Sequence, residues 1–325
     1  MSEANEAADT SACCASCGIA EIDDIKLVPC DGCDLVKYCS DDCMENHKSE
    51  HEENCKKRAA ELRDDELLFK QPEGTHMGDC PICCLPLPLD EERYLTYECC
   101  SKVVCKGCLF ASGLSARGLS CPFCRSDIRT AKKIAKLRMK RVKANDPHSL
   151  YLHGLEQYNK GYYSRAFEYL SKAAELGDAQ AHFKLAMVYC LGHGVEKDEK
   201  KEIYHHEQAA IGGHPNARLF LGEHEYRKKN LDRAVKHWII AATQGDGYGI
   251  KMLMLGFKMG FVEKDDLDSA FRAHKVAVDA TKSPQRQAEE KLMSKSIDDS
   301  VRQKLAELEE KFNSVLRDTP WSEGR

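Results

Sequence analysis

Cysteine pairs two residues apart dominate the first 125 residues, which hold 17 of the chain's 18 cysteines. Two thiolates at this spacing can reach one tetrahedral Zn²⁺ from a tight turn, and a second pair completes its four ligands. The candidate ligands are Cys14, Cys17, Cys30, Cys33, Cys39, Cys43, His51 and Cys55 in a first array, and Cys80, Cys83, Cys99, Cys100, Cys105, Cys108, Cys121 and Cys124 in a second. Eight ligands per array predict two zinc ions each, about four per chain, in closed sites that stabilise a fold.

Disulfide bonds are the rival explanation for so many cysteines, but they are rare inside cells. The chain of 325 residues opens with an acidic, polar segment that lacks the apolar run of a secretory signal. No stretch approaches the roughly 18 to 20 apolar residues needed to span a bilayer. These features predict an intracellular protein of the cytoplasm, the nucleus or both, which keeps its thiols reduced, binds zinc and does not enter a membrane.

Residues 1–55 carry 14 acidic and 3 basic side chains, and the whole chain has a formal net charge of −5. Zinc-bound thiolates would make the folded protein more acidic still. This field repels phosphate backbones and argues against nucleic acid as a partner. The basic stretch 126–146 could bind a polyanion or direct nuclear import. We interpret it as a helix that joins the second array to the region after it, because charge runs are usually solvated faces.

An internal repeat follows residue 146. The pairs Ala173-Ala174, Ala209-Ala210, Ala241-Ala242 and Ala277-Val278 recur at offsets of 36, 32 and 36 residues, and Gly177, Gly213 and Gly245 follow the first three. Small residues let antiparallel helices approach closely, and a glycine commonly ends a helix. The pattern predicts a solenoid of helical hairpins over 147–283, in which each hairpin buries its apolar face on the next.

The elements that position the ligands are therefore two small modules at the start of a rod. The predicted fold class is two tandem zinc-bound α+β modules followed by an all-α helical-hairpin solenoid. The predicted segments are a disordered acidic tail (1–13), the first module (14–55), a linker (56–79) with a helical piece over 58–68, the second module (80–125), a basic linker helix (126–146), the repeats (147–283) and a C-terminal helix (284–325). We interpret this last helix as a cap on the final repeat, with a short coiled coil as the alternative.

The first array resembles a MYND-type zinc finger through CASC, CDGC, YCSDDC and HKSEHEENC, which ends at Cys55. The interleaved pattern of that family implies one zinc on Cys14, Cys17, Cys39 and Cys43, and another on Cys30, Cys33, His51 and Cys55. Cys13 lacks the two-residue spacing, and we interpret His47 as a packed residue that does not bind metal. Fingers of this family commonly dock proline-containing peptides through a glutamine and a tryptophan. Met44 and Lys48 stand there instead, so the resemblance implies metal binding but does not extend to the residues of that peptide site.

The second array resembles a RING-type finger through CPICC, YECCSKVVCKGC and CPFCR. The resemblance implies one zinc on Cys80, Cys83, Cys105 and Cys108, and another on Cys99, Cys100, Cys121 and Cys124. Lys102 stands where a histidine ligand is usual, and an ammonium cannot ligate. Adjacent Cys99 and Cys100 then give an all-cysteine variant, with Cys84 as a spare. RING fingers that promote ubiquitin transfer bind a ubiquitin-conjugating enzyme. The resemblance implies that the residues for this contact are Ile82, Pro122 and Arg125.

The second repeat contains AHFKLAMVYCLGHGVEKD, which resembles the Sel1-like pattern, a relative of the tetratricopeptide repeat. A RING-like finger, a basic helix and Sel1-like repeats in this order, over about residues 80–283, are similar to proteins of diatoms and related algae. We predict a non-enzymatic scaffold whose zinc modules and repeats bind other proteins or peptides. The alternative is a ubiquitin ligase that recruits a conjugating enzyme and uses the repeats as substrate receptor. No Gly-rich phosphate loop or nucleophile motif indicates a hydrolase or an oxidoreductase.

Overall fold

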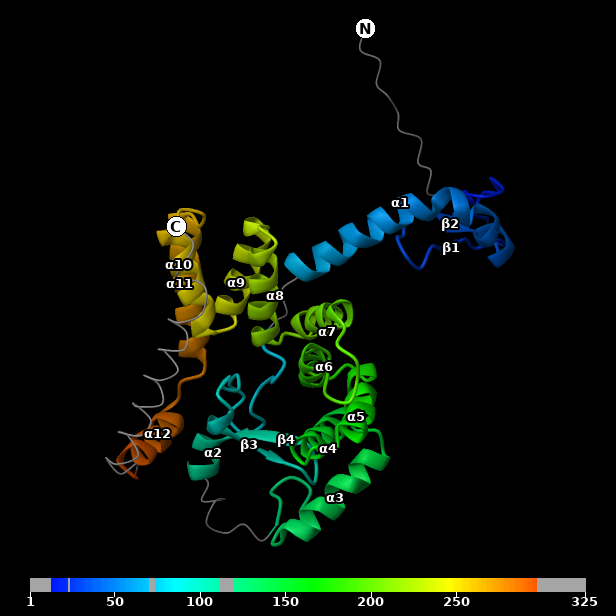
Figure 1. The fold of residues 1–325 in the computed structure, drawn as a ribbon. Coiled ribbons are helices and arrows are strands. Elements are labelled where there is room, and N and C mark those ends of the chain that lie inside the picture. The colour runs from blue at the N-terminus through cyan, green and yellow to red at the C-terminus, as the bar shows by residue number, and fades with distance from the viewer. Residues whose placement is uncertain (1–12, 23, 70–73, 112–119, 297–325) are drawn as a thin grey trace. The chain divides into compact units, whose positions relative to one another are not determined.

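The computed structural model describes residues 13–22, 24–69, 74–111 and 120–296, in two compact units, Met1–Pro72 and Glu73–Arg325 (Figure 1). The predicted acidic tail, apart from residue 13, lies outside the described residues. None of the described helices is long and apolar enough to cross a membrane. The elements are β1 (Val28–Pro29), β2 (Lys37–Tyr38), α1 (Asp41–Leu68), a 3₁₀ turn η2 (Glu91–Arg93), β3 (Tyr94–Tyr97), β4 (Lys102–Cys105), α2 (Lys106–Ala111), α3 (Ala131–Lys143), α4 (Pro147–Asn159), α5 (Tyr163–Glu175), α6 (Ala179–Leu191), α7 (Glu199–Ile211), α8 (Pro215–Arg227), α9 (Leu231–Thr243), α10 (Gly247–Lys258), α11 (Lys264–Ala280) and α12 (Pro284–Ser296).

The first unit is a small hairpin followed by one long helix. Strands β1 and β2 are antiparallel, with Val28 opposite Tyr38. The Ser40 side chain accepts a hydrogen bond from the backbone N–H of Cys43, which caps α1 at its start. The helix predicted over 58–68 is continuous with the last helix of the finger. The buried cluster of this unit consists of Leu27, Tyr38 and cysteines. Metal cross-links must therefore supply most of its stability.

The second cysteine module is built on the antiparallel pair β3 and β4, with Tyr94 opposite Cys105 and Tyr97 opposite Lys102. Its core combines cysteines with Leu87, Tyr97, Val104 and Leu109. The basic helix α3 follows and packs on two cores at once. Leu137 contacts the core of this module, whereas Met139 and Val142 contact the core of the first hairpin. Helix α3 therefore connects the module to the repeats, and its lysines lie at the surface.

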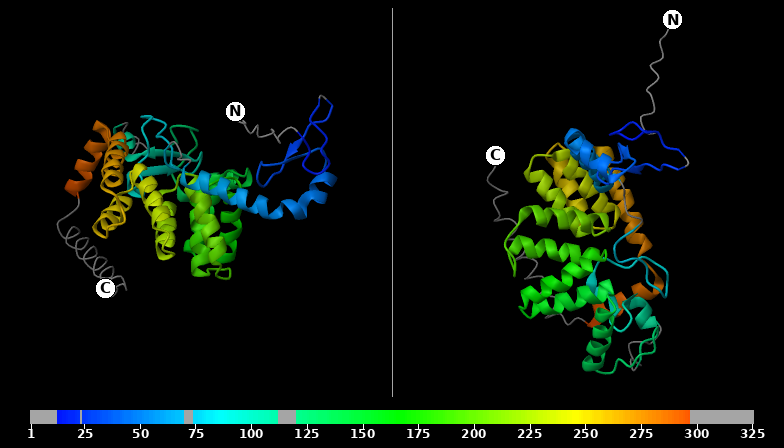
Figure 2. Two further views of the ribbon diagram at one scale, coloured as in Figure 1. Left: turned by 90° about the horizontal axis from the view of Figure 1, so that it is seen from above. Right: turned by 90° about the vertical axis from the view of Figure 1, so that its right-hand side faces the viewer.

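Four antiparallel hairpins follow α3 in the described part of the second unit: α4/α5, α6/α7, α8/α9 and α10/α11, each stacked on the next (Figure 2). The predicted solenoid is confirmed. Ala173, Ala209 and Ala241 are fully buried, as expected where two helices approach closely. Gly177 and Gly213 take φ angles of +84° and +83° after α5 and α7, a left-handed conformation that glycine adopts at little cost.

The second cysteine module, with the segment before it, lies along one edge of the array, where each hairpin joins the next (Figure 1). The Ser101 hydroxyl donates to Oδ1 of Asp146 at 2.6 Å, in the turn between α3 and α4. The His76 amide donates to the carbonyl of Gly213 at 3.1 Å, between α7 and α8. The Gln244 side chain, between α9 and α10, donates to the carbonyl of Gly74 at 3.3 Å. This edge of the solenoid is therefore occupied by the chain itself.

Helix α12 departs from the predicted cap on the last repeat, because it packs against α2 of the second cysteine module. The physical reason is local. A Cβ atom at Gly107 would lie 2.6 Å from the backbone of Arg286, so glycine in α2 lets the two helices touch. The remainder of the predicted C-terminal helix, residues 297–325, lies outside the described residues.

Candidate metal centres

Four groups of predicted ligands come together, two in each cysteine array. Within each group the four ligand atoms lie within 4.8 Å of one another. The groups are Cys14, Cys17, Cys39 and Cys43; Cys30, Cys33, His51 and Cys55; Cys80, Cys83, Cys105 and Cys108; and Cys99, Cys100, Cys121 and Cys124. We call them centres 1 to 4 in this order. The first two interleave along the chain, as do the last two, so each centre ties together segments that are distant in sequence.

The same backbone turn presents a cysteine pair in every centre. The residue after the pair has a left-handed φ, and its N–H donates to the carbonyl of the first cysteine. The N–H groups of Gly18, Asp34, Cys84 and Arg125 reach the carbonyls of Cys14, Cys30, Cys80 and Cys121 at 2.9, 3.2, 2.8 and 2.9 Å. Such a turn places both thiols on one side, where a single ion can bind them. Arg125 thus has a backbone role that sequence spacing alone does not reveal.

The spacing of the thiols fits zinc. Tetrahedral bonds of about 2.3 Å place neighbouring sulfur atoms about 3.8 Å apart. The Sγ–Sγ distances are 3.5 Å for Cys17–Cys39, 3.6 Å for Cys39–Cys43, 3.7 Å for Cys30–Cys55, 3.9 Å for Cys83–Cys105, 3.6 Å for Cys100–Cys121 and 3.5 Å for Cys99–Cys124. These four clusters are compatible with four zinc ions.

The histidine of centre 2 approaches through Nε2, which lies 3.1 Å from Sγ of Cys33. His51 follows Cys43 by eight residues and precedes Cys55 by four, so one face of α1 carries all three side chains. His47 lies one turn earlier and outside both centres. Its Nδ1 is 3.0 Å from the hydroxyl of Tyr38, and its ring stacks on that of His51. It therefore packs beside the metal site.

The pKa values of clustered thiols are shifted in opposite directions. Burial raises the pKa of Cys14, but the backbone N–H groups of Cys17 and Cys39 outweigh it and lower the pKa to about 6. Hydrogen bonds with Cys17 and Cys43 raise the pKa of neighbouring Cys39 to about 12. One thiolate in a group thus opposes ionisation of the next, and a divalent cation removes that opposition by binding all four.

Adjacent Cys99 and Cys100 both reach centre 4 because they occupy the turn between β3 and β4. The Cys100 amide donates to the carbonyl of Tyr97 at 3.0 Å, and Ser101 has a φ of +54°. Neighbours in an extended strand would point to opposite faces, but this turn directs both thiols to one side. Cys13, Cys84 and Lys102 are exposed and belong to none of the four clusters.

The candidate contacts for a conjugating enzyme are all exposed. Ile82, in the turn of centre 3, is 42% exposed, which is high for an isoleucine. Pro122 lies within the turn of centre 4, and Arg125 directly follows it. Exposure leaves these side chains accessible, and their role in binding stays a prediction.

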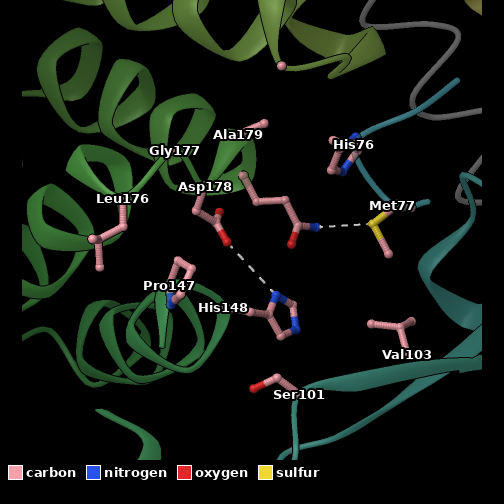
Figure 3. A pocket seen from close by; sticks show the side chains of 12 residues that line it. His76, Met77, Ser101, Val103, Pro147, His148, Leu176, Gly177, Asp178 and Ala179 are labelled. Carbon is pink, nitrogen blue, oxygen red and sulfur yellow. Dashed lines mark hydrogen bonds and ion pairs between the residues drawn. The ribbon is translucent and has the colours of Figure 1, made fainter. Parts of the chain in front are cut away.

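Sequence reasoning missed the junction between the second module and the repeats. A cavity of about 330 Å³ lies there, lined by His76, Met77, His148 and Asp178 among others (Figure 3). Asp178 caps α6 by accepting from the Ala181 amide at 2.8 Å, and burial raises the pKa of its carboxyl to about 6. No three metal-binding side chains converge in this cavity among the described residues. The N-cap position of Asp178 was the only sequence signal.

Comparison with protein families gives two matches. The MYND finger family matches residues 14–55, and the Sel1 repeat family matches residues 149–178, 179–214 and 216–246. Comparison with curated proteins gives no match. Similar solved structures include a Sel1 repeat protein from Oxalobacter formigenes (23% identity, 55% of this chain, 72% of that chain, TM-score 0.39). Others are a protective antigen with an SLR fold from uropathogenic Escherichia coli (20%, 59%, 39%, 0.37) and an immunity protein from Pseudomonas aeruginosa (20%, 56%, 65%, 0.32). Residues 14–55 are thus a MYND finger, and residues 149–246 comprise three Sel1 repeats.

Proposed function

We propose that this protein is a scaffold that holds other proteins, and that α10 of the last hairpin is one of its docking surfaces. MYND fingers and Sel1 repeats typically mediate protein–protein interactions, and both are present. The proposal is carried by an apolar row formed by Tyr248 and Leu255 of α10 and by Met259, the residue that caps its C-terminal end. Their spacing of seven and four residues places them on one helix face. They are 48%, 44% and 56% exposed.

The row is exposed among the described residues, and α10 belongs to the last of the four hairpins. In a solenoid each hairpin covers the one before it, and a terminal hairpin needs a polar outer face to stay soluble. Helix α12, the next helix after the last hairpin, packs on α2 instead. The exposed row is nevertheless apolar, and contiguous apolar surface is a feature of protein–protein binding sites.

Charge defines the chemistry of the partner. Lys251 and Lys258 are exposed, lie seven residues apart, and run beside the apolar row. Neither has a carboxylate partner among the described residues. The complementary ligand is an amphipathic helix with an apolar stripe flanked by Asp or Glu, as in helix-in-groove recognition.

A designed peptide pair tests this surface. One helix carries leucines every three or four positions with flanking glutamates, and the second has lysines in place of the glutamates. We expect the zinc-loaded full chain to prefer the acidic peptide in fluorescence anisotropy. Leu255→Asp should weaken binding about 10- to 100-fold, as expected for a central anchor. The double variant Lys251→Glu, Lys258→Glu should reverse the preference, and Lys275→Glu on α11 should leave it unchanged.

Three results would overturn the docking site. The first is equal binding of both peptides by the wild-type chain and the charge-reversal variant. The second is displacement of the acidic peptide by a peptide of residues 297–325, which would assign the face to the chain's own C-terminus. The third is dimerisation that Leu255→Asp abolishes, which would assign the face to a second copy.

Ubiquitin ligase activity is the second candidate function, favoured by the exposure of Ile82, Pro122 and Arg125 beside centres 3 and 4. The test is formation of ubiquitin chains by the zinc-loaded protein with a panel of conjugating enzymes. Ile82→Ala and Arg125→Gly should both abolish it. Glycine removes the arginine side chain and keeps the left-handed turn. Leu95→Ala, at an exposed position of β3, is the matched control. A panel without chains would exclude this candidate for the enzymes tested.

A further inference from the structure

Arg286 of α12 reaches deep into the second cysteine module. Its side chain is buried, with 3% of the residue exposed. Nη1 donates to the carbonyls of Pro86 and Thr281, both at 2.7 Å. Nη2 donates to the carbonyl of Leu85 at 3.2 Å and approaches Sγ of Cys83 at 3.3 Å. The guanidinium therefore touches a ligand of centre 3 and the backbone directly after it.

The charge of Arg286 has no carboxylate to balance it among the described residues. A buried cation is costly unless an opposite charge lies close to it. A zinc ion with four thiolates carries a net charge of −2. Arg286 contacts centre 3 through Cys83. The negative charge of a zinc–thiolate centre would therefore favour burial of this arginine.

The packing of α12 depends on the same centre. Helix α2 begins directly after Cys105 and contains Cys108, two ligands of centre 3. The backbone of Arg286 lies so close to Gly107 that a Cβ there would be 2.6 Å away. Zinc bound in centre 3 would fix both Cys105 and Cys108, and with them the surface of α2 on which α12 packs.

We propose that zinc binding in centre 3 and packing of α12 are coupled through Arg286, so that bound zinc stabilises the packing of α12 on the second cysteine module. Coupling between two binding events is reciprocal. Loss of zinc from centre 3 must release α12, and loss of the Arg286 contacts must weaken zinc binding there. Substituting a group that hydrogen-bonds a metal ligand typically lowers metal affinity about 10- to 100-fold. We expect Arg286→Met to have an effect of this size at one of the four centres.

The first arm of the test measures metal affinity. Full-length wild-type, Arg286→Met and Arg286→Lys proteins are titrated with a chelator, and the zinc ions retained are counted by native mass spectrometry. One zinc should leave Arg286→Met at about 10- to 100-fold lower chelator concentration, with Arg286→Lys intermediate. Arg93→Ala is the matched control. It removes the exposed Arg93–Glu290 ion pair (3.1 Å), which also holds α12 but does not contact the centre.

The second arm measures the helix. Hydrogen exchange of residues 284–291 is compared between wild type and Cys83→Ser, which removes a ligand from centre 3. We expect loss of protection in α12, while α8 and α9 keep theirs and so exclude global unfolding. Chelator resistance of Arg286→Met equal to that of wild type would overturn the proposal. So would full protection of α12 in a Cys83→Ser protein that has lost one zinc.

Discussion

Two glycines in the first turn of α10 allow the close packing of the last hairpin to be measured. A Cβ at Gly249 would lie 2.8 Å from the carbonyl oxygen of Trp238 and 3.0 Å from the amide nitrogen of Ala242, both backbone atoms of α9. A Cβ at Gly247 would meet nothing within 4 Å. Alanine at either site gains helix propensity, up to about 1 kcal/mol. Only Gly249→Ala must also push α9 and α10 apart, and overpacking of this kind costs about 1–3 kcal/mol.

Gly247→Ala should therefore be neutral or slightly stabilising, and Gly249→Ala should be less stable than Gly247→Ala by about 1–3 kcal/mol. For a unit of this size each kcal/mol shifts the melting temperature by roughly 2–4 °C. The assay is thermal and urea unfolding of the zinc-loaded chain, followed by far-UV circular dichroism at fixed zinc concentration. Equal stability of the two variants would refute the inference that small residues at this position set the helix spacing.

Two further predictions concern the metal centres and pH. Native mass spectrometry should find four zinc ions in the wild type and in Cys84→Ser, but three in Cys100→Ser, and four in the last would exclude Cys100 as a ligand. Burial lowers the pKa of His214, which stacks on Phe183, to about 2. An unfolded histidine has a pKa of about 6.5. The stability from keeping this ring neutral is therefore present above pH 6.5 and declines as the pH falls, by about 1.4 kcal/mol at pH 5.5. His214→Phe keeps the stack and should remove that part of the decline in unfolding free energy, and equal declines would contradict the assignment.

The sequence was most informative where structure is local. A two-residue gap between cysteines almost dictates a knuckle turn, and helical spacing placed His51 and Cys55 on one face. The alanine pairs at Ala209 and Ala241 revealed the hairpins because close helix packing demands small side chains at fixed intervals. The predicted fold class needed little more than these two rules.

Contacts between distant segments were the part that sequence could not supply. Arg286 meets Pro86 across 200 positions, and nothing in the residues around it distinguishes it from a surface arginine. Helical periodicity predicts that a tail can be a helix, but it does not say which surface the helix covers. Gly107 permits the close approach of α12, but the sequence alone does not show which segment packs against it.

The position of the second cysteine module along the hairpin junctions limits the gain or loss of repeats during evolution. A rod whose units touch only their neighbours tolerates the gain or loss of a unit. Here the second cysteine module lies along the junctions from Asp146 to Arg286 and is hydrogen-bonded to both of these residues. A hairpin inserted between these two residues would move the attachment points apart, so the module restricts the array between Asp146 and Arg286 to the four hairpins that the structure describes.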